Sequence, residues 1–126
     1  MSTRATYQIQ TVLRGVYPRL SVRTSTVYIH HDGYPSGAAH YLRNGIDLAR
    51  ITERPLLECF IWANARAEMT DSHECHGDTD YRYSLYAKEG VWWVTASERD
   101  FRDDSYNPIF DGPVDRFIAK HGERAA

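Results

Sequence analysis

The stretch 27-VYIHHDGYPSGAA-39 decides the fold, because the end of a strand, a turn and the start of a helix follow one another within it. Val27 and Ile29 alternate with Tyr28 and His30, as expected for a strand with one buried face. Asp-Gly at 32–33 favours a turn with a positive φ at the glycine. Ser36 then stands where a helix N-cap is expected, and apolar residues recur at helical spacing from 37 to 50. This stretch predicts a domain that mixes strands and helices.

The segments on either side of this stretch extend the pattern. Residues 5–13 and 20–30 alternate as strands, and they pair most simply as a hairpin through the Gly- and Pro-containing connection at 14–19. Downstream, the pattern predicts the following order: a helix from 54 to 67, a polar irregular segment at 68–79, strands at 80–87 and 91–96, an acidic loop at 97–110, and a last helix capped by Asp111.

The order of these elements is ββ–αα–ββ–α. It predicts an α+β domain with an antiparallel four-stranded sheet and the helices packed on one face. The other face of such a sheet stays open unless a partner covers it. We expect one domain over residues 1–126, with residues 121–126 as a loose tail.

Composition excludes several classes of protein. The chain has 126 residues and a formal charge of −2. It lacks a basic run, which disfavours direct nucleic-acid binding. No apolar stretch reaches the roughly 20 residues of a membrane span, and no secretory leader is expected at the N-terminus. With only two cysteines, Cys59 and Cys75, a disulfide framework is not expected, and a reducing cytoplasm is the default location.

Two motifs concentrate the polar chemistry. The first is the strand end and turn at 28–35, and the second is the segment from His76-Gly77-Asp78 to the Tyr-rich strand at 81–83. The helix that begins after the first motif offers free N–H groups, which attract anions. The candidate ligand-binding residues are therefore Tyr28, His30, Asp32, Tyr34, His76, Asp78 and Arg82.

Catalytic interpretations of these motifs are weaker. If His30, Asp32, His76 and Asp78 converge, they could ligate a transition metal, although their spacing matches no strong zinc pattern. Cys75 beside a histidine could form a thiolate pair. The chain has no GxSxG elbow, no Walker A loop and no GxGxxG. We assign no catalytic residue and expect no cofactor.

The two motifs together resemble a family of small uncharacterised proteins encoded by bacteriophages and prophages. The hallmarks are the strand that ends in His-x-Asp-Gly-Tyr-Pro and the later His-Gly-Asp segment that leads into Tyr81-Arg82-Tyr83. The resemblance implies a host-cytosol setting and a small accessory protein that acts on host machinery. It implies no enzymatic activity.

Three hypotheses follow. The leading one is a non-catalytic binding protein that inhibits a host defence system, such as an anti-CRISPR protein, by binding a host protein or sequestering a small anionic ligand. In that hypothesis the acidic loop at 100–104 could face a basic groove. The second is a metal-dependent hydrolase that acts on a nucleotide or phosphoester. The third is a homodimeric assembly protein that buries its open sheet face, with an apolar patch formed by whichever of Tyr81, Tyr83, Trp92 or Trp93 is exposed.

Overall fold

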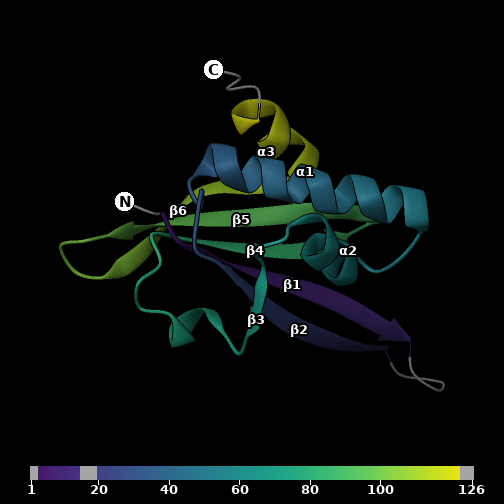
Figure 1. The fold of residues 1–126 in the computed structure, drawn as a ribbon, viewed down its shortest axis with the longest axis horizontal. Coiled ribbons are helices and arrows are strands. Elements are labelled where there is room, and N and C mark those ends of the chain that lie inside the picture. Colours follow the sequence, from purple (N-terminus) through teal and green to yellow (C-terminus); the bar gives the residue numbers. More distant parts are fainter. Residues whose placement is uncertain (1–2, 15–19, 123–126) are drawn as a thin grey trace.

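The central strand β1 (Ala5–Arg14) pairs differently with each of its neighbours. It runs antiparallel to β2 (Leu20–Ile29) and parallel to β4 (Tyr81–Lys88). This is a computed structural model that describes residues 3–14 and 20–122. Its sheet has six strands in the order β3-β2-β1-β4-β5-β6 (Figure 1). The α+β class is as predicted, but the expected four-stranded antiparallel sheet is wrong, because the sheet is mixed and two strands wider.

Both additional strands come from segments that the sequence pattern assigns to irregular structure. The edge strand β3 (Glu68–Thr70) has three residues, too few to show an alternation. At the other edge, β5 (Val91–Asp100) continues beyond the predicted end and pairs with β6 (Ser105–Pro113). The segment 97–110 is expected to be an acidic loop, but most of β6 falls within it, and an edge strand tolerates Pro108 because one of its sides needs no ladder hydrogen bonds.

The parallel pairing follows from the path of the chain between β3 and β4. β3 pairs with β2, whereas β4 pairs with β1 on the far side. The segment 71–80, which includes the short 3-10 helix η1 (His73–Cys75), therefore crosses the sheet before β4 begins. A simple pair of hairpins would not need this crossing.

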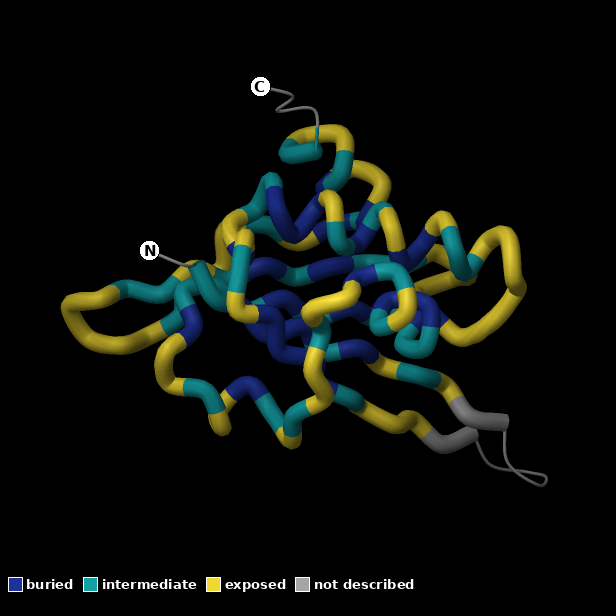
Figure 2. The backbone as a smooth tube through the Cα atoms, in the orientation of Figure 1, coloured by how far each residue is buried: buried dark blue, intermediate teal, exposed yellow. Residues whose placement is uncertain are grey.

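Three helices in the described part of the chain cover one face of the sheet (Figure 1). They are α1 (Pro35–Thr52), α2 (Leu56–Ala63) and α3 (Val114–His121). Helices on one face were predicted, and this is confirmed. The core between the two layers takes alternate residues from the central strands: Ala5, Tyr7, Ile9, Val27, Ile29, Tyr83, Leu85, Val94 and Ala96. Figure 2 shows the buried backbone concentrated in these strands and in the helix segments that face them.

The turn before α1 differs in detail from the prediction. The positive φ falls on Asp32 (55°) rather than on Gly33. The N-cap is Tyr34, with Pro35 as the first helical residue, so Ser36 lies inside the helix. The carbonyl of Asp32 packs against the Cα of Gly37 so closely that a side chain at 37 would collide with it. The loop therefore folds back over the first turn of the helix.

The end of the chain also needs two corrections. Asp111 lies in β6, and the N-cap of α3 is Pro113. His121 belongs to α3 and contacts the ring of Phe117, with centroids 4.8 Å apart. Of the predicted tail, residues 123–126 lie outside the described part of the chain, as does most of the predicted connection at 14–19.

The aromatic residues assigned to a dimer patch do not share a surface. Tyr83 is fully buried under the helices, and Tyr81 and Trp92 pack against the same core. Trp93 alone points to the opposite face, where it stacks on Tyr86 with centroids 6.4 Å apart. No helix in the described residues combines the length and apolar character needed to cross a membrane.

Candidate functional site

Four of the seven predicted binding residues come together on the sheet face that the helices leave uncovered. They are Tyr28 of β2, His30 directly after that strand, and His76 and Asp78 of the crossing segment. Tyr28 alternates with the core residues Val27 and Ile29, so its side chain lies on the opposite face. The crossing segment passes over this face, and that path brings the two sequence motifs into contact.

The ring of Tyr28 is the centre of this arrangement. It is only 4% exposed, because the His76 imidazole stacks on it with centroids 3.9 Å apart and planes at 11°. The imidazole of His30, two residues further along the chain, meets the Tyr28 ring at 70° with centroids 4.4 Å apart. The three rings form one packed unit.

Hydrogen bonds fix the polar end of that unit. The Tyr28 hydroxyl donates to Asp78 Oδ2 at 2.9 Å, and Arg4 Nε lies 3.4 Å from the same oxygen. Burial and this bond to Asp78 raise the pKa of Tyr28 to about 12. At neutral pH the hydroxyl therefore stays protonated and acts as a donor.

Strand β3 supplies partners for both imidazoles. His30 Nε2 lies 2.9 Å from Glu68 Oε2, and His76 Nε2 lies 2.7 Å from Thr70 Oγ1. The register pairs Glu68 with Tyr28, so the carboxylate is placed beside the rings. Sequence reasoning missed Arg4, Glu68 and Thr70, because β3 is too short to show an alternation and Arg4 precedes the first strand. We refer to the following residues as the Tyr28 cluster: Arg4, Tyr28, His30, Glu68, Thr70, His76 and Asp78.

Asp32 and Tyr34 form a separate pair at the start of α1. The Tyr34 hydroxyl donates to Asp32 Oδ1 at 3.1 Å, and neither side chain has a hydrogen bond or ion pair to the Tyr28 cluster among the described residues. The loop between them is held from the core, since the Tyr83 hydroxyl donates to the Gly33 carbonyl at 2.6 Å. This pair therefore shapes the turn before α1 and lies outside the cluster.

Arg82 is also outside the cluster. Its guanidinium lies 3.7 Å from the centroid of the Tyr106 ring, and its Nη1 is 3.8 Å from Glu74 Oε2. The Tyr106 hydroxyl in turn donates to the carbonyl of Thr79 at 2.7 Å. Arg82 thus joins β4 and β6 to the crossing segment.

His73, which sequence reasoning did not select, holds the crossing segment on the sheet. Its Nδ1 lies 2.6 Å from Thr6 Oγ1 of β1, and its Nε2 lies 3.2 Å from Ser84 Oγ of β4. Burial and the nearby Arg82 lower the pKa of His73 from 6.5 to about 4, so the imidazole is neutral at physiological pH. A neutral imidazole can donate to one hydroxyl and accept from the other.

The geometry offers little to the metal and thiolate hypotheses. In residues 3–14 and 20–122, three or more His, Cys, Asp or Glu side chains nowhere gather so that they could hold a metal ion. The Cys75 thiol accepts a hydrogen bond from Ser72 Oγ at 3.4 Å. Cys59 is buried.

The acidic loop carries its own counter-charges. Asp100 accepts from the guanidinium of Arg102 at 3.1 Å, and Asp104 accepts from that of Arg99 at 2.6 Å. These pairs neutralise much of the negative charge that was expected to face a basic groove.

Comparison with known proteins adds no relative. No protein-family model matches this chain, and searches of the curated proteins and of the solved structures find no match either.

Proposed function

We propose that this chain is a non-catalytic accessory binding protein of phage or prophage type, which engages a host defence protein through the surface of the Tyr28 cluster. The motif resemblance supplies the phage setting. Residues from both motifs meet in this cluster, which is why we place the binding surface there. The observation that carries the proposal is that four exposed, ionisable side chains are held in fixed positions around one buried ring.

The exposed rim of the cluster has the chemistry of a recognition surface. Side-chain exposure is 40% for Arg4, 51% for Asp78, 46% for His30 and 60% for Glu68. Arg4 is paired with Asp78 and His30 with Glu68, so one guanidinium, one imidazole and two carboxylates have a fixed order across the surface. Such a pattern favours a partner with the complementary order of charges and repels others.

Preorganisation is the second argument. A flexible side chain that must be ordered at an interface costs about 0.5–1.5 kcal/mol of binding free energy. In the Tyr28 cluster the rings are stacked and the charged groups are paired before any partner arrives. A partner would therefore find these side chains already in place.

The same contacts oppose a role for Tyr28 as a general base. A general base must be free to accept a proton from substrate. The Tyr28 hydroxyl already donates to Asp78, and burial and this bond raise its pKa to about 12, so at neutral pH it is protonated.

The test is an assay of defence in living cells. The protein is expressed in bacterial strains that each carry one defence system, and phage plating is counted. We expect expression to restore plating in at least one strain, and Glu68→Lys to abolish that effect because it reverses a rim charge.

The matched control is Glu89→Lys, an equal charge change at an exposed position on the β4–β5 turn. It should retain full activity. Thermal unfolding of both variants confirms that each is folded. Equal rescue by Glu68→Lys, or no rescue in any strain, would contradict the proposal.

A further inference from the structure

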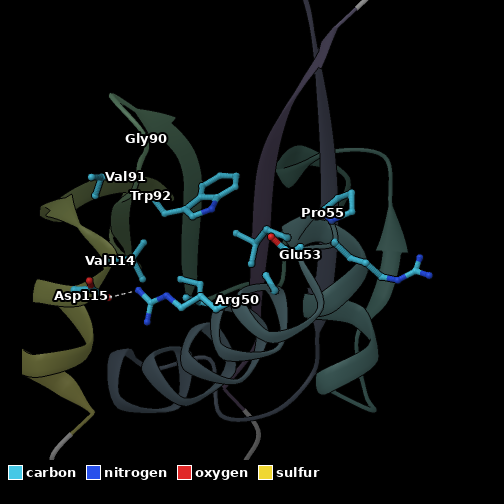
Figure 3. Close-up of a pocket in the computed structure, with 12 residues that line it drawn as sticks. Arg50, Glu53, Pro55, Gly90, Val91, Trp92, Val114 and Asp115 are labelled. Atoms are coloured by element: carbon cyan, nitrogen blue, oxygen red, sulfur yellow. Dashed lines mark hydrogen bonds and ion pairs between the residues drawn. The ribbon is translucent and has the colours of Figure 1, made fainter.

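A second feature lies on the helix side of the sheet. A pocket of about 500 Å³ opens between the C-terminus of α1, the start of α2, the β4–β5 turn and the start of α3 (Figure 3). The Tyr28 cluster lies on the opposite face of the sheet, and none of its residues lines this pocket. The pocket is therefore distinct from the Tyr28 cluster.

Buried aliphatic side chains form part of the pocket wall. Ile46, Leu56 and Val114 are buried and contribute to its lining. Trp92 of β5 extends its indole ring into the space from the sheet side (Figure 3). An indole ring offers a flat apolar surface with a negative electrostatic face, which attracts both apolar groups and cations.

Three of the four charged residues that line the pocket already have partners. Arg50 Nη2 lies 3.4 Å from Asp115 Oδ1, and a second carboxylate, that of Asp47, is 4.0 Å from its Nη1. Arg54 Nη1 lies 3.1 Å from Glu58 Oε1, which is outside the pocket. Both guanidinium charges are therefore compensated.

Glu53 is the exception. Its carboxylate forms no ion pair or hydrogen bond within the part of the chain that the structure describes, and Glu53 lines the same pocket as Trp92 (Figure 3). Its backbone is fixed, because it adopts a φ of 58° and its N–H donates to the Ala49 carbonyl at 2.8 Å. The uncompensated charge of the pocket is thus one carboxylate at a defined place.

The partial charges at the helix ends do not reverse the negative charge of the pocket. The C-terminus of α1, which borders the pocket, carries partial negative charge. The N-termini of α2 and α3 carry partial positive charge, but each has an acidic residue in its first turn, Glu58 and Asp115 respectively. The remaining field favours a cation.

We propose that this pocket binds a small organic ammonium ion. Its apolar part would lie against the Trp92 ring and between the aliphatic side chains, and its charged nitrogen would pair with Glu53. Carboxylate and aromatic ring together are the groups that recognise alkylammonium ions in proteins. The inference is independent of the function proposed for the Tyr28 cluster, which uses none of these residues.

The test uses two probes of similar shape and opposite charge, phenethylammonium and 3-phenylpropionate. Each is titrated into the ¹⁵N-labelled full chain, and the indole N–H signal of Trp92, assigned with Trp92→Phe, is followed by NMR. We expect a saturable shift with phenethylammonium and a much weaker response to 3-phenylpropionate.

Two matched variants locate the charge. Glu53→Gln should weaken phenethylammonium binding by about tenfold, as expected when a charge-assisted hydrogen bond is lost. Glu89→Gln should leave it unchanged, because Glu89 has a similar φ of 53° and is exposed, but does not line the pocket. Tighter binding of 3-phenylpropionate, equal affinity in Glu53→Gln, or no saturable shift at millimolar phenethylammonium would each overturn the proposal.

Discussion

The hydroxyl of Tyr83, in the middle of β4, donates a hydrogen bond of 2.6 Å to the carbonyl oxygen of Gly33 in the turn before α1. The two residues are 50 positions apart in the chain. This bond ties the loop of the first sequence motif to the strand of the second. It is fully buried, so its loss leaves the carbonyl of Gly33 without compensation from water.

Tyr83→Phe should destabilise the protein by about 1–3 kcal/mol, the cost of leaving a buried acceptor unpaired. Urea unfolding followed by circular dichroism measures the change. Tyr86→Phe is the matched control, because its hydroxyl bonds to an exposed carboxylate, that of Asp111, at 3.3 Å. A Tyr83→Phe protein as stable as the control would show that water satisfies the Gly33 carbonyl.

Stability should fall in mild acid because of His73. Its folded pKa, about 4, is below its ordinary value of 6.5, so the unfolded chain binds a proton first as the pH falls. The neutral His73 makes its full contribution to the free energy of unfolding above pH 6.5, and that contribution is lost as the pH falls from 6.5 to about 4. We expect a loss of up to about 3 kcal/mol, since a tenfold difference in proton affinity between the folded and unfolded chains corresponds to roughly 1.4 kcal/mol.

His73→Gln keeps a donor and an acceptor but cannot titrate, so its free energy of unfolding should depend less on pH across this window. Urea unfolding at a series of pH values compares the two proteins. His121→Gln, at the end of α3, is the control that should retain most of the wild-type slope. Parallel pH profiles for wild type and His73→Gln would assign the acid sensitivity to other groups.

Gly37→Ala should be among the most damaging single-methyl changes in this chain. The added Cβ would collide with the carbonyl of Asp32, and backbone on both sides would have to move. We expect destabilisation of about 3 kcal/mol, even though alanine is the better helix former by about 1 kcal/mol. Gly77→Ala is the control: its Cβ would meet no atom within 4 Å, so it should be neutral or slightly stabilising in thermal unfolding.

Arg82→Lys should lose the contact with Tyr106 although it keeps the charge. The planar guanidinium lies 3.7 Å from the ring centroid, a geometry that a lysine ammonium on a flexible stem does not reproduce. We expect destabilisation of about 1 kcal/mol in urea. In Tyr106→Leu the Arg82→Lys change should cost much less, and equal costs in the two backgrounds would show that the ring contact contributes nothing.

The long alternating segments can be predicted from the sequence, because each is long enough to show the two-residue period of a strand with one buried face. The alternation groups Tyr7 with Ile9 and Tyr83 with Leu85 on one face of each strand, and all four are buried. A glycine inside a helical pattern indicates close packing, and Gly45 lies where α1 meets α2, with the position of its missing Cβ 3.1 Å from the Cα of Phe60. Such signals are local, so a single sequence contains them.

The edges and the crossing could not be predicted, because their stability depends on neighbours. Glu68–Thr70 forms a strand only because β2 offers it an unpaired edge. The parallel register of β1 and β4 depends on a segment whose main anchor, His73, lies in a polar stretch without periodicity. For the same reason the motifs group Asp32, Tyr34 and Arg82 with the histidines, although only Tyr28, His30, His76 and Asp78 meet.

The parallel seam between β1 and β4 has a consequence for how the chain assembles. Each side of the seam is built from neighbours in sequence: β1 with β2, and β4 with β5 and β6. The seam itself joins Ala5 to Tyr81, so closing it brings together parts of the chain that are far apart in sequence. Local hairpins form faster than such long-range pairings, so two half-sheets should exist before they join. His73 bonds to Thr6 on one half and to Ser84 on the other, so it can form both hydrogen bonds only after the halves have met.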